Sequence, residues 1–337
     1  MSQYGSWLDA VKFNGSPIFK DACAEVDVNC PEFTGSAALG SAFKLSAENV
    51  ETDVVRGTIR LEPPPTYAFR NVNEGVSPSN GAYENTEFHL YNATAFVSKD
   101  VALIERDPAR GARYMQAETK SVMEGLIKGF GAQFYYGGTR LASEERGFKG
   151  IQTYVEKWKN ELTVSAGGAP AESGPTGLTS VYLVRFDETN GVSWLFGQGG
   201  AFTLSDPTRT TAADPNDPKK ILPIVQQEIS CYPGLAYYSK YAAARIANVQ
   251  TASVETPESI STSALTLAHL GVAIKKMRAK PSVILMNYSA GLLLAASIAT
   301  ATVDGTTVSL SGRLLDQYAG IPICYTDSLV DDEPRVG

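Results

Sequence analysis

The sequence predicts an α+β protein that combines one long helix, an extended two-stranded arm and a compact α/β region near the C-terminus. Three patterns support this prediction: a helical apolar stripe in residues 107–134, two strand-like legs in residues 56–98, and alternating strand and helix signals after residue 235. The 337 residues are enough for one large irregular domain or two ordinary ones. We find no internal repeat.

The arm is predicted from two extended legs that no helix separates. Residues 56–61 alternate weakly and stop at three consecutive prolines, Pro63 to Pro65, which force an extended backbone and supply no amide donors. Residues 67–81 are polar and rich in turn formers, and residues 87–97 are again strand-like. An isolated ribbon is only marginally stable in water, so we expect this hairpin to lie on another surface. Residues 1–55 are predicted to be an N-terminal arm with one short helix near residues 41–50.

The long helix has the strongest signal in the chain. Asp107 is a good N-cap and Pro108 suits the first helical position. The apolar stripe consists of Met115, Val122, Met123, Leu126, Ile127, Phe130 and Phe134. Glycines at positions 125, 129 and 131 each cost about 1 kcal/mol relative to alanine, which predicts close packing, bending or fraying near the end of the helix.

The middle of the chain is predicted to be mainly strands. Residues 179–186 read as a buried strand that the Asn190-Gly191 turn joins to residues 192–196 in a hairpin. Residues 204–220 read as a polar surface loop because prolines and aspartates interrupt them. Residues 237–249 read as a strand or a strand pair.

The C-terminal region has an α/β pattern. We expect a helix from Thr256 to about Lys280, a buried strand at 283–286 and a small apolar helix at 289–299. An Asp-Gly pair predicts a tight hairpin within residues 302–310, and residues 318–325 read as a final strand.

Composition and charge argue against several classes of function. Lys+Arg 29 against Asp+Glu 36 gives a net charge of −7, whereas gripping nucleic acid requires a basic face. The four cysteines have no metal-site spacing, and we expect no metal and no organic cofactor. The N-terminus lacks the pattern of a signal peptide, and the longest apolar run, residues 290–301, is too short to cross a bilayer. These features predict a soluble protein from a reducing compartment, without membrane contact.

A catalytic centre is the main alternative that the residues themselves raise. Ser289 lies between a predicted strand and a predicted helix, but the surrounding sequence lacks the glycine that precedes the serine in a nucleophile elbow. Asn287 or Ser289 is better explained as an N-cap. His269 falls inside a predicted helix and His89 in the arm, and there is no phosphate-binding lysine pattern. We therefore expect no enzyme activity, and keep a serine hydrolase centred on Ser289 as a distant alternative.

Several segments, taken in order, carry a resemblance to a known family. They are residues 69–75 (FRNVNEG), 134–137 (FYYG), 147–151 (GFKGI), 179–186 (TSVYLVRF), 234–235 (GL), 244–249 (ARIANV), 318–323 (YAGIPI) and 326–329 (TDSL). Together with the predicted architecture, this order resembles the major capsid proteins of tailed bacteriophages, which have the Hong Kong 97-like fold. The resemblance runs from about Arg56 to the C-terminus.

The resemblance implies a division of the chain into functional parts. These parts are an N-terminal arm (1–55), an extended loop (56–98), a peripheral domain (99–234) with a spine helix at 107–134, an axial domain (235–325) and a C-terminal return to the peripheral domain (326–337). The subunit is expected to form hexamers and pentamers of an icosahedral shell that encloses double-stranded DNA without sequence-specific binding.

The resemblance also implies partners and contact residues. Other copies of the chain are the main partners, with scaffolding, portal and decoration proteins in addition, and the scaffold is expected to be a separate protein. The residues expected to contact a neighbouring subunit are Arg70, Asn73, Glu74, Glu84 and Glu87. Assembly is expected in the cytoplasm of the bacterial host, and the product is the virion capsid.

Two further alternatives remain open on sequence grounds. The same fold builds bacterial nanocompartments, so a cellular shell protein is the nearest alternative, although no cargo-related feature supports it. A phage tail or portal component is the other, but such proteins rarely combine a spine helix with an arm and an α/β lobe.

Overall fold

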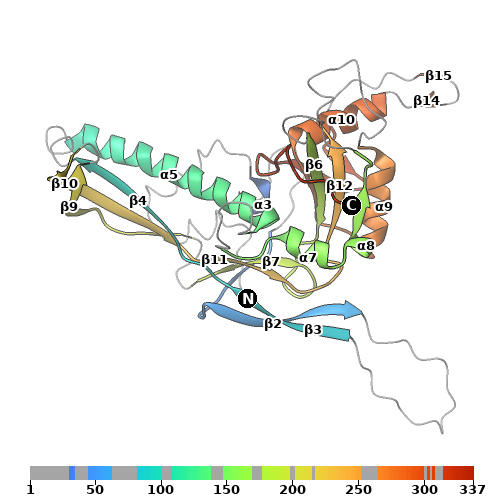
Figure 1. The fold of residues 1–337 in the computed structure, drawn as a ribbon, viewed down its shortest axis with the longest axis horizontal. Coiled ribbons are helices and arrows are strands. Elements are labelled where there is room, and N and C mark those ends of the chain that lie inside the picture. The colour runs from blue at the N-terminus through green and yellow to red at the C-terminus, as the bar shows by residue number, and fades with distance from the viewer. Residues whose placement is uncertain are drawn as a thin grey trace, which may run out of the picture.

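The computed structural model describes residues 30–34, 45–62, 82–100, 108–137, 147–168, 177–197, 202–214, 217–251, 265–299, 302–303, 306–307 and 314–337. The long helix and an elongated sheet extend to one side of the molecule, and a compact α/β lobe lies on the other (Figure 1). A two-stranded ribbon lies below both. The predicted α+β class is confirmed.

The long helix α5 spans Pro108–Tyr136, close to the predicted 107–134. Its 29 residues correspond to a length of roughly 45 Å. Met123, Ile127 and Phe134 are completely buried, whereas Leu126, which the stripe also includes, is only partly buried. The helix ends before Gly137, whose φ is +69°. A Cβ atom at this position would lie 2.7 Å from the amide nitrogen of Gly150, so the close turn requires glycine.

An elongated sheet lies beside the helix and corrects the prediction of a loop at 204–220. Its strands are β4 (Ala93–Asp100), β10 (Asp217–Cys231), β8 (Thr203–Leu204) and β9 (Thr208–Asp214). Nearly every described side chain of β9 is exposed, so the strand has no apolar alternation to reveal it. Its backbone pairs with β10 all the same, and the ladder includes Pro223. The polar composition of this stretch therefore reflects an exposed strand and does not indicate a loop.

A small sheet lies at the centre of the molecule and brings two further corrections. Its strands are β1 (Ala47–Asn49), β7 (Val192–Phe196) and β11 (Pro233–Tyr237). Residues 47–49 therefore form a strand in the stretch predicted to be helical, because pairing with β7 outweighs local propensity. The predicted hairpin of residues 179–196 is also wrong. The turn after Asp187 forms, but the two strands join different sheets and meet only at a bridge between Phe186 and Val192.

The α/β lobe contains the largest sheet. Its strands, in spatial order, are β16 (Gln317–Tyr318), β17 (Ile321–Tyr325), β13 (Val283–Met286), β6 (Leu178–Val184), β12 (Ala243–Gln250) and β5 (Thr163–Ser165). Residues 318–325 are thus two paired strands and not one, because Ala319 and Gly320 both have positive φ and form a tight turn. The pairing of β14 (Thr302–Val303) with β15 (Thr306–Thr307) confirms the predicted hairpin, whose turn residues Asp304 and Gly305 lie outside the described residues.

Two helices, α9 (Leu267–Met277) and α10 (Tyr288–Ala299), belong to the lobe. The structure places the start of α9 at Leu267 instead of Thr256, because Thr266 and His269 form a capping box there; residues 252–264 lie outside the described part.

Side chains of β6 alternate between two cores. Val181 and Leu183 pack in the core that contains α9 and α10, and Tyr182 and Val184 in the core that contains the spine helix. The sheet is therefore covered on both faces.

Short elements connect these layers. They are α3 (Pro31–Thr34), α7 (Ile151–Lys157), α8 (Lys159–Leu162) and the ribbon strands β2 (Val54–Glu62) and β3 (Ala82–His89). None of the described helices is both long enough and apolar enough to cross a membrane.

A buried ion pair fixes the C-terminal segment to the large sheet. Arg245 on β12 is 1% exposed and donates through Nη2 to Glu333 at 2.8 Å and through Nε to Ser180 at 2.9 Å. Glu333 also accepts a hydrogen bond from the hydroxyl of Tyr136, at 2.7 Å. The pair thereby joins the sheet, the last residues of the chain and the end of the spine helix.

The buried face of the spine helix can be tested with aspartate substitutions. Ile127→Asp places an unpaired charge at a fully buried position and should cost about 4 kcal/mol or more. Leu126→Asp, one residue away but partly exposed, should cost only about 1–2 kcal/mol. Soluble yield and thermal melting followed by circular dichroism distinguish the two variants. Equal damage at both positions would mean that the buried face is assigned wrongly.

Two glycines of the same helix form a second matched pair. A Cβ atom at Gly129 would meet no heavy atom within 4 Å, so Gly129→Ala should raise stability by about 1 kcal/mol through helix propensity. A Cβ atom at Gly131 would lie 2.1 Å from Ser328 Oγ and 2.6 Å from Glu32 Oε1, so Gly131→Ala should destabilise the subunit. Melting temperatures that move in the same direction for both variants would contradict this prediction.

Candidate intersubunit contact site

The candidate site is the β2–β3 ribbon, and its base is fixed to the body by two buried side chains. Ile59 is 2% exposed and Phe88 is 1% exposed, although most other residues of the ribbon face solvent. The ring of Phe88 meets the ring of Tyr238 edge-on at a centroid distance of 5.6 Å. Gly57 leaves the space that the Phe88 ring fills, since a Cβ atom there would lie 2.6 Å from the ring.

Backbone hydrogen bonds add to this anchor. The amide of Arg60 donates to the carbonyl of Tyr238 at 2.9 Å, and the amide of Lys240 donates to the carbonyl of Arg60 at 2.8 Å. These bonds attach β2 to the turn after β11 as a short strand addition. These contacts therefore hold the ribbon against the body close to Glu62 and Ala82, where its described part ends.

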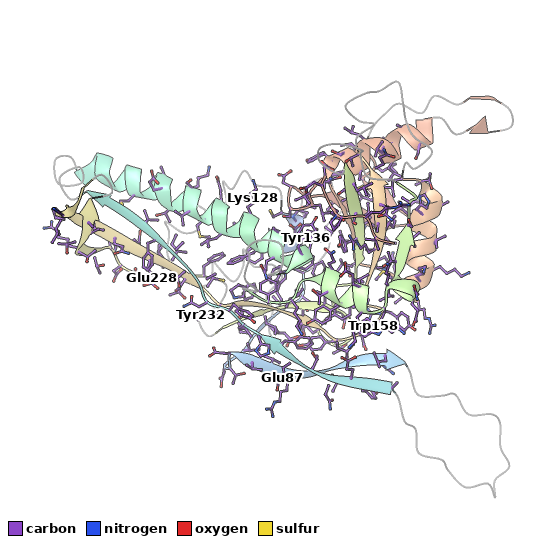
Figure 2. The ribbon with its side chains drawn as sticks, in the orientation of Figure 1. Glu87, Lys128, Tyr136, Trp158, Glu228 and Tyr232 are labelled. Carbon is purple, nitrogen blue, oxygen red and sulfur yellow. The ribbon has the colours of Figure 1, made fainter. Side chains whose placement is uncertain are left out.

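The predicted contact residues divide into two groups. Arg70, Asn73 and Glu74 lie outside the described residues. Glu84 and Glu87 are described, and both have partners within the same subunit: Glu84 pairs with Lys157 at the end of α7, and Glu87 accepts from Arg56 Nε across the ribbon at 3.1 Å. Figure 2 shows Glu87 on the ribbon, well away from Lys128 of the spine helix.

These two ion pairs differ in what they do. The Arg56–Glu87 pair is exposed and screened by solvent, so it contributes little to stability. The Glu84–Lys157 pair connects the ribbon to the body, across 73 residues of sequence. Sequence reasoning identified the carboxylates but not their partners, because no local pattern relates α7 to the ribbon.

Two adjoining grooves lie beside the ribbon. The first has a volume of about 840 Å³ and lies between the ribbon and Lys149, with a mainly polar lining that includes Asn85 and His89. The second has a volume of about 490 Å³ and lies where the chain passes from β3 to β4, against Gly125, Gly129 and Phe148. Both grooves are open to solvent on the described part of the molecule.

Single aromatic side chains are exposed on the elements that extend from the body. Tyr83 on the ribbon is 55% exposed, Phe96 on β4 is 53% exposed, and Tyr232 after β10 is 40% exposed. Phe96 lies opposite Glu228 in the strand register, on the face of the sheet that points away from the buried side chain of Val97. These rings are candidates for contact with other molecules.

The geometry around Ser289 does not form a nucleophilic site. The amide of Ala290 donates to Asn287 Oδ1 at 2.9 Å, so Asn287 is the N-cap of α10, as predicted. The Ser289 hydroxyl donates to a carboxylate oxygen of Asp331 at 3.2 Å, and not to an imidazole. His269 is occupied by the capping box of α9, and its burial lowers its pKa. Within the described residues, no three His, Cys, Asp or Glu side chains are grouped to hold a metal ion.

Comparison with known proteins agrees with this arrangement. The family model for the major capsid protein GP7 matches residues 46–337. A solved structure from bacteriophage Epsilon15 is similar over 97% of this chain and 97% of that chain, with a TM-score of 0.56 at 16% identity. The procapsid of bacteriophage JBD30 covers 96% of this chain and 98% of its own, with a TM-score of 0.45 at 11% identity.

The JBD30 capsid covers 87% of this chain and 93% of its own, with a TM-score of 0.47 at 9% identity. No curated protein matches the chain. The likeness to the Epsilon15 structure confirms the predicted Hong Kong 97-like fold. The family match extends over the ribbon, the spine helix and the α/β lobe, and it favours a phage capsid over a bacterial nanocompartment. The chain belongs to the major capsid protein GP7 family and is a subunit of a bacteriophage capsid shell.

Proposed function

We propose that the subunit assembles into hexamers and pentamers that close an icosahedral head around double-stranded DNA. The observation that carries this proposal is the ribbon, which is held to the body through Ile59 and Phe88 while most other described side chains of β3 face solvent. A second copy of the chain is the partner that a shell supplies at every position. The net charge of −7 suits a shell that encloses DNA without binding it tightly.

We propose the tip residues Arg70, Asn73 and Glu74 as the contact with the neighbouring subunit. Glu84 and Glu87 are proposed to contribute at its edge, where their intramolecular partners Lys157 and Arg56 already balance their charge. The contact therefore depends more on shape and hydrogen bonding than on net attraction.

The proposed domain division is an N-terminal arm (1–55), extended loop (56–98), peripheral domain (99–234), axial domain (235–325) and C-terminal return (326–337). The six-stranded sheet draws β5 and β6 from before residue 235, so we assign those two strands to the axial domain as well. Hydrogen bonds from Thr326 and Ser328 to Glu32, beside the spine helix, support a C-terminal return to the peripheral domain.

The remaining partners follow from shell assembly. We propose a separate scaffolding protein, a portal and decoration proteins as partners, and assembly in the cytoplasm of the bacterial host. Shell closure needs no reacting group, and we propose that the chain has no catalytic activity and no resident cofactor. Stoichiometric zinc or iron in the purified protein, measured by elemental analysis, would overturn that proposal.

Replacing residues 68–82 with a short Gly-Ser turn tests the role of the loop. Ile59 and Phe88 lie outside the replaced segment, so the subunit should keep its circular dichroism spectrum and its solubility. The same variant should fail to form closed shells when it is expressed with the scaffold that the wild type needs. Electron microscopy of the products provides the measurement. Normal shells would mean that the loop is not an assembly element, and an unfolded subunit would mean that it belongs to the core.

A pair of point substitutions separates contact from folding. Tyr83→Ser removes an exposed ring and should change subunit stability by less than about 0.5 kcal/mol while reducing shell yield. Phe88→Ala removes a buried ring and should destabilise the subunit by about 3–5 kcal/mol. Thermal melting of the unassembled subunit and counting of shells are the two readouts. Shell yield that falls only in proportion to stability would argue against a contact at Tyr83.

A further inference from the structure

The carboxyl group of Glu32 occupies an unusual position between three segments that are distant in the sequence. Glu32 lies on α3 and is 0% exposed. Its side chain accepts hydrogen bonds from the hydroxyls of Thr326, at 3.1 Å, and Ser328 in the C-terminal segment. The hydroxyl of Tyr135 at the end of the spine helix donates to its other oxygen at 3.3 Å. One carboxyl group therefore joins the N-terminal segment, the spine helix and the C-terminal segment.

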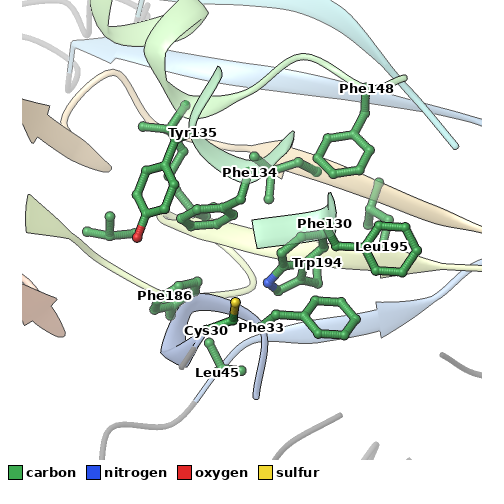
Figure 3. Close-up of a cluster of buried hydrophobic side chains, with 14 of the residues drawn as sticks. Cys30, Phe33, Leu45, Phe130, Phe134, Tyr135, Phe148, Phe186, Trp194 and Leu195 are labelled. Atoms are coloured by element: carbon green, nitrogen blue, oxygen red, sulfur yellow. The ribbon is translucent and has the colours of Figure 1, made fainter. Parts of the chain in front are cut away.

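The junction is closely packed around Gly131 and Phe33. At Gly131, a Cβ atom would lie 2.1 Å from Ser328 Oγ and 2.6 Å from Glu32 Oε1. On the other side of α3, the ring of Phe33 packs against Trp194 at a centroid distance of 5.0 Å, and Trp194 Nε1 donates to the carbonyl of Glu32 at 2.9 Å. Figure 3 shows Cys30 and Phe33 of this segment among rings from α5 and β7.

Among the described residues, no basic side chain makes a hydrogen bond to the Glu32 carboxyl. On the spine helix, Tyr135 faces Glu32, and burial raises the pKa of its hydroxyl. Lys128 of the same helix lies near Cys30, where its charge opposes the rise in the pKa of the thiol. The C-terminal segment contributes Asp327, and the N-terminal segment contributes Cys30, whose thiol pKa burial raises to about 12. Among the described residues, the partners of the Glu32 carboxyl are hydroxyl groups and not basic side chains.

The ionised form of Glu32 is therefore disfavoured in the closed junction. Burial raises its pKa from the usual 4.5 to about 7, although hydrogen bonds from Ser328, Thr326 and Tyr135 oppose this effect. A carboxyl whose pKa is higher in the closed state takes up a proton when the junction closes. Its contribution to closure is fully present below pH 4.5 and is lost as the pH rises through about 7.

We propose that Glu32 is a proton-controlled latch that holds residues 30–34 between the spine helix and the C-terminal segment when its carboxyl is neutral, and releases them when it ionises. Release would free residues 30–34 from the junction without unfolding the sheets. The ion pair of Arg245 and Glu333 would still hold the C-terminal segment, because it does not involve Glu32. The inference concerns the isolated subunit and does not depend on the proposed mode of assembly.

Amide hydrogen exchange of the full chain tests the latch. The amide of Phe33 donates to the carbonyl of Cys30 at 3.0 Å and reports on opening of the segment. After correction for the intrinsic exchange rate, opening should increase about tenfold between about pH 6 and about pH 8.5, and then level off. Amides of β13 should show no such change, and they serve as the reference for global unfolding.

Two variants identify the titrating group. Glu32→Gln keeps the shape but cannot ionise, so its exchange should remain slow over the whole range. Ser328→Ala removes a donor that favours the ionised form, so the transition should move to higher pH. Exchange in the wild type that does not depend on pH after correction would disprove the latch, even if both variants failed to fold. A pH profile in Glu32→Gln equal to that of the wild type would disprove it as well.

Discussion

The packing of Trp194 against the end of the spine helix is the contact on which the rest of the fold depends. Its indole is 1% exposed and lies 5.4 Å from the ring of Phe134 on α5, 5.0 Å from Phe33 on α3 and 5.6 Å from Phe148 after the helix. One side chain of the central sheet thus touches the helix, the N-terminal segment and the chain that follows the helix. Each ring loses both buried area and aromatic contacts if another moves, so opening of residues 30–34 would cost the contact between Phe33 and Trp194.

The two ends of the described chain meet near this same place. Glu32 bonds the C-terminal segment through Ser328, while Glu333 bonds Tyr136 and Arg245. Breaking a buried ion pair by removing one partner typically costs about 3–5 kcal/mol, so the C-terminal segment is a structural part of the sheet that it covers. By contrast, most described side chains of β3 and β9 are exposed, so the body of the subunit leaves much of these two strands uncovered.

Much of the fold could be predicted because its signals are local. The apolar stripe of α5, the buried runs of β7 and β13, and the N-cap Asn287 of α10 all depend on neighbouring residues, whereas the predicted N-cap Asp107 lies outside the described residues. The errors have a common cause in long-range pairing. Strand β9 is exposed and was predicted as a loop, β1 becomes a strand only beside β7, and β6 and β7 separate into two sheets after a correctly predicted turn. In the candidate site, the partner of Glu84 could not be predicted for the same reason, because Lys157 is 73 residues away.

A shell subunit must also remain soluble before it assembles, and this requirement limits what its contact surfaces can look like. One large exposed apolar patch would lead to aggregation of free subunits. In the described part of this chain, the exposed rings of Tyr83 and Phe96 instead lie on separate strands, β3 and β4. In the shell that we propose, each such ring would offer a weak contact, and the repetition of many copies would add these contacts together. The same dispersal explains why sequence motifs identify the architecture of such a subunit far better than its contacts: no single contact residue needs a chemistry that would distinguish it from an ordinary surface.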